Sequence, residues 1–201
     1  MSKQEKIGIL GGTFNPVHKG HLQMARECQA KLGLDKVIFI PASVPPLKSG
    51  NITDYNKRRE WLSQVTAGEA AWEISDIEQE RQGKSYTYDT LLVLQEMYPQ
   101  AELYFLTGAD SLTTLTAWFR WQDILDLCYF VITTRPGYEM IMSEEIRQVN
   151  AEARKGILLL PIEALPISST EIREALQQRK DIEKYIPAEI IDEVKQAWQW
   201  M

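Results

Sequence analysis

The chain has little histidine and little cysteine, with two residues of each among its 201. Cys28 and Cys128 lie far apart and form no C-x-x-C pair, so the sequence predicts neither a zinc ribbon nor a redox motif. Long apolar runs are also missing, which excludes a membrane-spanning helix. The polar start over residues 1–6 does not resemble a signal peptide. We therefore expect a cytoplasmic protein with no membrane partner.

The chain also lacks an excess of positive charge, since its formal net charge is −6 and its pI is about 5.1. A basic surface is what broad nucleic-acid binding needs, so a nucleic-acid partner is not expected. A small anionic ligand is not excluded, because a few local donors can bind it. Length and composition predict a single domain over residues 1–201, and no heptad pattern indicates an oligomeric state.

Apolar, β-branched segments alternate with helical patterns along the whole chain. The expected strands cover residues 6–10, 36–41, 72–75, 102–107, 128–133 and 156–161. The expected helices cover about 18–32, 54–67, 86–98, 111–126 (with a break), 143–154, 168–178 and 187–200. Continuously apolar strands separated by helices are typical of a parallel sheet covered on both faces, so we expect a doubly wound α/β fold. Ligands of such folds bind at the carboxyl ends of the strands.

Both histidines lie in one segment, GGTFNPVHKGH, directly after the first expected strand. Gly11 and Gly12 are expected to bend the backbone sharply, and the next helix begins with free N–H groups that attract phosphate. His18 and His21 are three residues apart and share one face of its first turn. Helix-capping histidines remain an alternative. Cys28 is about two turns away, too far to complete a zinc site, and the G-x-G-x-x-G dinucleotide fingerprint is absent.

A second motif, ISSTEIR, occupies residues 167–173. Ser168 and Glu171 fit a capping box at the start of a helix, which would by itself be only a well-capped helix. Together, HKGH and ISSTEIR resemble the H-x-G-H and I-S-S-T-x-I-R motifs of the nucleotidyltransferase superfamily. The resemblance implies a Rossmann-like nucleotidyltransferase fold, in which C-terminal helices from about residue 168 complete an ATP site.

Other segments resemble one branch of that superfamily, the bacterial nicotinate-mononucleotide adenylyltransferases. They run in order from residue 7 to about 190: GGTFNPVHKGHL, VPPLK, GKSYTYDTL, GADSL, WFRW, RPG, ISSTEIR and YIP. The resemblance implies transfer of AMP from ATP to nicotinate mononucleotide with Mg²⁺, giving deamido-NAD and pyrophosphate. Asn15 and Leu47 depart from the family pattern, which commonly has Asp and His there.

The resemblance and the local chemistry together predict the site residues. The catalytic set is His18, His21, Lys48 and Arg173. The ATP-binding set is Gly11, Gly12, Thr13, Phe14, Gly108, Asp110, Ile167, Ser168, Ser169 and Thr170. The pyridine nucleotide is expected to contact Thr87, Trp118 and Arg135. No protein ligand to a metal is predicted, because Mg²⁺ keeps mostly water and phosphate oxygens.

Several residues keep a second interpretation. Asp110 either accepts hydrogen bonds from ribose hydroxyls or caps a helix. Trp118 stacks on the pyridine or belongs to the core, while Lys48 and Arg135 are either ligand-binding or solvated. For the function, the alternatives are nucleotidyl transfer to another phosphate such as phosphopantetheine, and a nucleotide-binding module without activity.

Overall fold

The parallel strands of the chain form a single sheet. The computed structural model describes residues 3–46, 52–135, 137, 140–163 and 165–199. Within these residues six strands pair in the order β3-β2-β1-β4-β5-β6, and every neighbouring pair is parallel. The strands are β1 (Lys6–Gly12), β2 (Lys36–Pro41), β3 (Trp72–Ile74), β4 (Glu102–Gly108), β5 (Tyr129–Thr134) and β6 (Ile157–Pro161). The order runs outward in both directions from β1 and β4, so the expected doubly wound sheet is confirmed.

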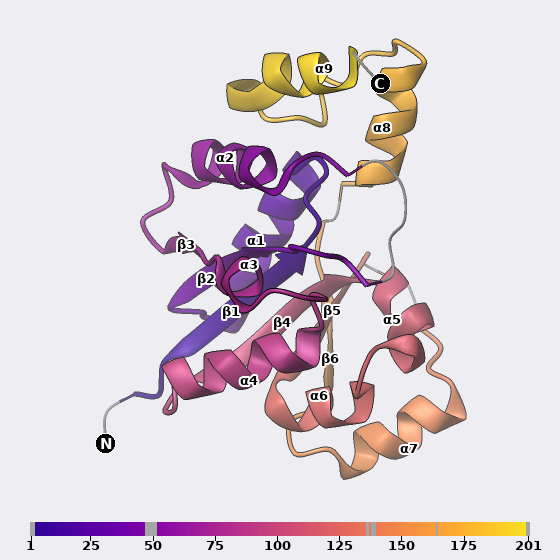
Figure 1. The fold of residues 1–201 in the computed structure, drawn as a ribbon. Helices are drawn as coiled ribbons and strands as arrows, with labels where there is room; N and C mark the ends of the chain where they lie inside the picture. The colour runs from indigo at the N-terminus through magenta and orange to yellow at the C-terminus, as the bar shows by residue number, and fades with distance from the viewer. Residues whose placement is uncertain (1–2, 47–51, 136, 138–139, 164, 200–201) are drawn as a thin grey trace.

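Helices connect the strands, as Figure 1 shows. They are α1 (Lys19–Leu32), α2 (Tyr55–Thr66), α3 (Ile77–Arg81), α4 (Thr87–Met97), α5 (Asp110–Thr114), α6 (Trp121–Leu127), α7 (Glu144–Glu152), α8 (Ser169–Gln177) and α9 (Ile191–Gln199), with 3₁₀ turns η1 (Leu115–Ala117) and η2 (Ala188–Ile190). The break expected within residues 111–126 is present, because η1 separates α5 from α6. The short helix α3 was not expected.

Each face of the sheet carries its own hydrophobic core. Successive side chains of a strand point to opposite faces. Ile7 and Ile9 of β1 therefore pack with α4, α6 and α7, while Leu10 packs with α1 and α2. Figure 1 shows α2, α8 and α9 above the sheet and α4, α6 and α7 below it. The molecule thus has three layers, with the sheet in the middle.

The C-terminal helices belong to the core on the α1 side. Ile172 of α8 and Val194 of α9 are fully buried in the same cluster as Trp61 of α2. The Trp61 indole N–H also donates to Glu193 at 3.1 Å. This packing brings the start of α8, about 150 residues further along the chain, to the turn between β1 and α1.

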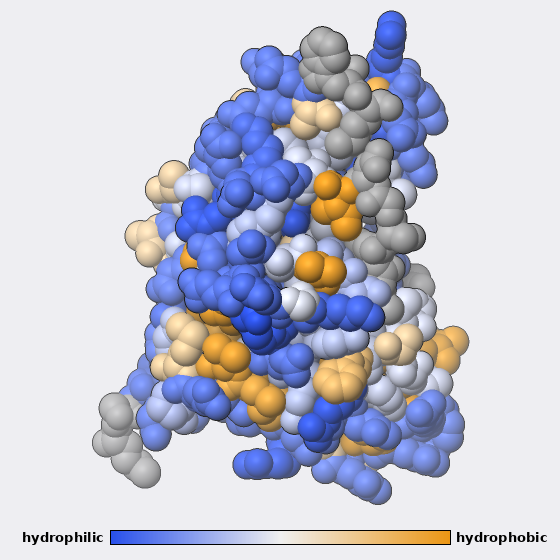
Figure 2. Space-filling view, viewed as in Figure 1, coloured by the Kyte–Doolittle hydropathy of each residue, from blue (hydrophilic) through white to orange (hydrophobic). Residues whose placement is uncertain are grey.

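The face seen in Figure 2 is largely hydrophilic, with small hydrophobic areas over α4. Leu92 and Met97 of this helix are 37% and 52% exposed. In the part of the chain that the structure describes, none of the helices combines the length and apolarity needed to span a bilayer.

Candidate active site

The turn after β1 is built differently from the sequence expectation. Gly11 and Gly12 continue β1, where they pair with Ile40 and Pro41 of β2, so the predicted sharp bend at these glycines is wrong. The chain instead turns at Phe14, whose φ of 48° lies in the left-handed region. Close packing explains the glycine at position 12, since a Cβ there would lie 3.3 Å from the Phe14 ring. The small size of these glycines leaves space for neighbouring aromatic rings at the end of β1, and it does not produce a bend.

The two histidines stack on each other at the start of α1. Their ring centroids are 3.7 Å apart, and the Phe14 ring meets His21 edge-on at 5.0 Å. The His18 backbone N–H donates to Nδ1 of His21 at 3.2 Å. An accepting Nδ1 carries no proton, so the neutral His21 ring has its hydrogen on Nε2, where it can donate. The predicted shared face is confirmed.

His18 is the buried member of the pair, with 5% of its surface exposed. Burial lowers its pKa from 6.5 to about 4, so the ring is neutral at pH 7 in the ligand-free protein. Its buried Nδ1 has no hydrogen-bond partner among the residues that the structure describes. An unsatisfied buried polar atom is unfavourable, which is expected where a ligand supplies the missing partner.

Gly20, within HKGH, faces the second motif. A Cβ at this position would come within 3.0 Å of Nδ1 of His18 and 3.5 Å of Cγ2 of Ile167. The distance to Ile167 is an ordinary contact, whereas the His18 ring would have to shift. The lack of a side chain at Gly20 therefore leaves space for the His18 ring beside ISSTEIR.

Two side chains of α8 join the second motif to the first. The Ser169 hydroxyl donates to the Pro16 carbonyl at 2.9 Å, and Nη1 of Arg173 donates to the Asn15 carbonyl at 2.9 Å. A guanidinium has five N–H donors, so Arg173 retains further donors for phosphate oxygens. Both motifs thus contribute to one site.

The start of α8 has the predicted capping box. The Ser168 hydroxyl accepts from the Glu171 N–H at 3.2 Å, and the Glu171 carboxylate accepts from the Ser168 N–H at 2.8 Å. Thr170 Oγ1 accepts from Nη2 of Arg173 at 3.1 Å. These bonds fix the direction in which the helix start, with its partial positive charge, faces the histidine turn.

Arg58 of α2 holds the turn after β1 in place through hydrogen bonds. The sequence did not predict this role. It is 1% exposed, and it donates to the carbonyls of Thr13 (2.7 Å), Thr53 (2.8 Å) and Ala42 (2.9 Å). Asn15 joins the same network, because its Oδ1 accepts from the Thr53 N–H at 3.2 Å. Nothing in the local sequence distinguishes Arg58 from a surface arginine of a helix.

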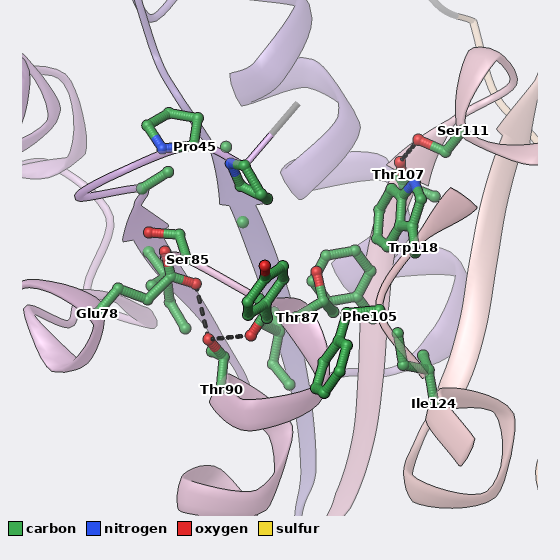
Figure 3. A pocket seen from close by; sticks show the side chains of 18 of the residues that line it. Pro45, Glu78, Ser85, Thr87, Thr90, Phe105, Thr107, Ser111, Trp118 and Ile124 are labelled. Atoms are coloured by element: carbon green, nitrogen blue, oxygen red, sulfur yellow. Dashed lines mark hydrogen bonds between the residues drawn. The ribbon is translucent and has the colours of Figure 1, made fainter. Parts of the chain in front are cut away.

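A cavity of about 290 Å³ opens beside this turn, where β1, β2 and β4 end (Figure 3). Five of the predicted residues line it, namely Gly11, Gly12, Thr13, Thr87 and Trp118. The carboxyl edge of the sheet at the reversal of strand order is where doubly wound folds bind ligands.

Trp118 belongs to the core and also lines the cavity, while its stacking on the pyridine stays a prediction. Its ring lines the cavity, and it also meets Phe105 and Phe130 edge to face, with centroids 6.0 Å and 5.7 Å away. Its indole N–H donates to Thr114 at 3.4 Å. The core contacts therefore hold the indole in place at the cavity.

Asp110 does not cap a helix, so that alternative is wrong. It is the first residue of α5, and the N-cap is Ala109, which makes no side-chain capping bond. Ala109 already has helical φ and ψ angles, so the helix begins one residue earlier than a capping aspartate requires. Asp110 is exposed at the end of β4, next to Gly108, and neither residue lines the cavity.

The remaining predicted residues lie elsewhere. Arg135 is exposed directly after β5 and does not line the cavity. Lys48, predicted to be catalytic, and Leu47, one of the departures from the family pattern, lie outside the described residues.

The cavity wall includes a buried polar cluster that sequence reasoning missed. Its members are Glu78 of α3, Ser85 and Thr90, all less than a tenth exposed. Burial raises the pKa of the Glu78 carboxyl, while hydrogen bonds from Ser85 and Thr90 act in the opposite direction. No motif marks these residues, which are brought together only by the fold.

The described residues contain no group of three or more His, Cys, Asp or Glu side chains that could hold a metal ion.

Comparisons with known proteins agree with this geometry. A family model described as cytidylyltransferase-like matches residues 9–175. The Clostridium novyi (strain NT) protein named "Probable nicotinate-nucleotide adenylyltransferase" is 43% identical over 91% of this chain and 92% of its own. A Desulfitobacterium hafniense (strain Y51) protein of the same name is 40% identical over 92% and 91%.

A solved structure shares the fold. It is that of Plasmodium falciparum nicotinic acid mononucleotide adenylyltransferase complexed with NaAD, with a TM-score of 0.77, 21% identity and coverage of 96% of each chain. The family model, the curated relatives and the two joined motifs lead to the same conclusion. The chain belongs to the cytidylyltransferase-like family and, within it, to the nicotinate-nucleotide adenylyltransferases.

Proposed function

We propose that this protein transfers AMP from ATP to nicotinate mononucleotide, giving deamido-NAD and pyrophosphate. The observation that carries the proposal is the junction of the two motifs, through Ser169 and Arg173, beside a cavity lined by Thr87 and Trp118. It combines a phosphate-binding turn with a neighbouring space for a flat ring. ATP is an intracellular metabolite, which supports the cytoplasmic location expected from the sequence.

The reaction needs no protein nucleophile and no general base. The second pKa of a phosphate monoester is about 6, so the substrate phosphate is largely ionised at pH 7. One of its oxygens attacks the α-phosphorus of ATP, and the bond from that phosphorus to the bridging oxygen of the β-phosphate breaks. Pyrophosphate leaves with the bonding electrons. The protein contributes positioning and stabilisation of negative charge.

The histidine pair is suited to donate hydrogen bonds to that charge. We assign His21 to the α-phosphate, because its accepting Nδ1 leaves the hydrogen on Nε2. We assign His18 to a neighbouring phosphate, where its buried Nδ1 gains the partner it lacks. A donor placed in advance near developing charge stabilises the transition state more than one that must reorient.

The second motif holds the far end of the triphosphate in this proposal. Arg173 and the helix start at Ser169 and Thr170 bind the β- and γ-phosphates, since helix N-termini and guanidinium groups both favour phosphate. Thr13 orients the phosphates from the end of β1. Lys48 is assigned to the same phosphates from the resemblance alone.

The two nucleosides lie on either side of this phosphate site. Thr87 and Trp118 receive the pyridine ring in the cavity, where an indole face favours a cationic pyridinium. Gly108 and Asp110, at the end of β4, face the adenosine, and Asp110 accepts from the ribose hydroxyls. Arg135 is proposed only as an outlying anion contact, since it is exposed and away from the cavity.

We propose Mg²⁺ as the metal that accompanies ATP. The oxygen-rich phosphates and water satisfy its preference for hard ligands. Bound in this way, the ion neutralises phosphate charge, and it enters as part of the substrate.

Pyrophosphate release tests the proposal directly. The purified protein is incubated with ATP and Mg²⁺ and with one of three acceptors: nicotinate mononucleotide, nicotinamide mononucleotide or phosphopantetheine. We expect turnover with nicotinate mononucleotide. Turnover with phosphopantetheine alone, or silence of the folded protein with all three, contradicts the proposal. Turnover with both pyridines keeps the reaction and widens the acceptor.

A further inference from the structure

Glu78 is the one acidic side chain among the described residues that line the cavity. It is 6% exposed, so its carboxylate has lost most of its contact with water. Burying a carboxylate is unfavourable unless hydrogen bonds compensate. A buried carboxylate in the wall of this cavity is therefore expected to have a structural role. The hydrogen-bond partners of Glu78 indicate that role.

The Thr90 hydroxyl of α4 donates to this carboxylate. Oγ1 of Thr90 lies 2.7 Å from Oε1 of Glu78, as Figure 3 shows, and the Tyr86 carbonyl is a more distant acceptor for the same hydroxyl at 3.1 Å. Ser85, just before the start of α4, is a buried neighbour of Glu78 in the cavity wall. Glu78 thus links α3 to α4 from inside the cavity wall.

Ser85 extends the link to the opposite wall. Its Oγ accepts from the N–H groups of Ser43 (2.9 Å) and Val44 (3.2 Å), and its own N–H donates to the Val44 carbonyl (3.0 Å). A serine hydroxyl has one hydrogen to donate and two lone pairs to accept. The two N–H groups therefore occupy both lone pairs of Ser85 and hold its side chain against residues 43 and 44.

The bonds fix two walls of the cavity relative to each other. Ser43 and Val44 come directly before Pro45 and Pro46, which line one side. Thr90 lies one helical turn after Thr87, which lines the other. Ser85 therefore joins the first wall to the segment just before α4, and the bond from Thr90 to Glu78 holds the start of α4 against α3. The histidine turn is held by other residues.

We infer that Glu78 is a positioning residue for the pyridine mononucleotide, which sets the shape of its pocket through Thr90 and the start of α4 and contacts neither ATP nor the reacting phosphates. This inference rests on the proposed function, because it assigns the cavity to the pyridine ring. It predicts that loss of the carboxylate weakens one substrate and spares the other.

Substitution of Glu78 by Ala separates the two substrates. A hydrogen bond to a charged group is strong enough that its loss corresponds to about a tenfold to hundredfold change in affinity. We expect the KM for nicotinate mononucleotide to rise by about that factor, and the KM for ATP to stay within about twofold. Glu80→Ala is the matched control, since Glu80 is exposed on the same short helix; both of its KM values should stay unchanged.

Glu78→Gln tests whether the acceptor or the charge matters. The glutamine oxygen can still accept from the Thr90 hydroxyl, but a neutral acceptor forms a weaker hydrogen bond than a carboxylate. We expect its KM for nicotinate mononucleotide to lie between those of wild type and Glu78→Ala. A value as high as that of Glu78→Ala contradicts positioning through hydrogen bonds.

Thr90 provides a second test if Glu78→Ala does not fold. Thr90→Val keeps the shape but loses the hydroxyl, whereas Thr90→Ser keeps the hydroxyl. We expect Thr90→Val to raise the KM for nicotinate mononucleotide alone, and Thr90→Ser to restore it. Equal changes in both KM values, or no change, overturn the inference. Failure of the proposed function is distinguishable, because the wild-type protein itself would then release no pyrophosphate.

Discussion

At the scale of single residues, the two histidines differ in burial and in what fixes them. His18 is enclosed and neutral at pH 7, because burial lowers its pKa to about 4. His21 is half-buried, and its Nδ1 accepts from the backbone N–H of His18. The backbone of one histidine therefore orients the ring of the other, although the H-x-G-H spacing makes them look equivalent.

Replacement of His21 by Ala tests the catalytic assignment. We expect kcat to fall by about two to three orders of magnitude, as for the loss of a donor aimed at developing charge. ATP affinity should change much less, because Arg173 and the start of α8 still hold the triphosphate in our proposal. Steady-state kinetics and calorimetric ATP titration measure the two effects. A kcat near that of wild type removes His21 from the reaction.

His18 makes stability depend on pH. Its pKa is about 4 in the folded protein and 6.5 when the ring is fully hydrated, so below pH 6.5 the unfolded chain takes up a proton that the folded one does not. The free energy of unfolding should therefore fall by about 2 kcal/mol between pH 7 and pH 5 through this residue. Urea unfolding of wild type and His18→Asn at both values measures it. Equal pH dependence in the two proteins contradicts the assignment.

At the scale of elements, the capping box at α8 connects stability to ATP binding. Ser168→Ala removes the bond to the Glu171 N–H, and loss of such a cap lowers stability by about 1 kcal/mol. Because this helix start faces the histidine turn, we also expect the KM for ATP to rise. Urea unfolding and ATP kinetics measure the two effects.

The chain offers a matched control for that substitution. Ser143 caps α7 in the same way, accepting from the Ile146 N–H at 3.3 Å on the far side of the sheet. Ser143→Ala should lower stability by a similar amount and leave the KM for ATP unchanged. If both variants raise that KM, the effect of Ser168 is general destabilisation and not the loss of an ATP contact.

Most elements could be predicted because their patterns are local. Buried strands such as β2 are continuous apolar runs, and α1 ends at Gly33 in the left-handed conformation that favours glycine. The helix α3 was missed because five residues are too few to show a period. The bend placed at Gly11–Gly12 was wrong because a glycine pair suits close packing as well as turning.

The site could be predicted only in part, for a related reason. HKGH and ISSTEIR are short, continuous motifs, so each can be recognised in the sequence alone. Arg58 and Glu78 act through partners that lie five to 45 residues away, on other elements, so only the fold shows what they do. The capping alternative for Asp110 rested on its residue type, yet Asp110 is the first residue of α5 and Ala109 occupies the N-cap position.

At the scale of the whole molecule, the reactivity of each cysteine measures how tightly the core on one face of the sheet is packed. Cys28 and Cys128 are fully buried in the cores on opposite faces, and burial raises both pKa values to about 12. The thiolate is the reactive form. We expect both thiols to resist Ellman's reagent in the native protein and to react in denaturant. Labelling of either one under native conditions, faster than global unfolding, contradicts the packing described.

The bond from Arg173 to the Asn15 carbonyl spans 158 positions of the sequence. Translation proceeds from the N-terminus, so β1 and the histidine turn emerge from the ribosome long before α8 exists. A chain that stops before α8 therefore lacks Arg173 and Ser169, which face the histidine turn in the finished fold. In our proposal these residues bind the triphosphate, so adenylyl transfer has to wait until α8 has been synthesised.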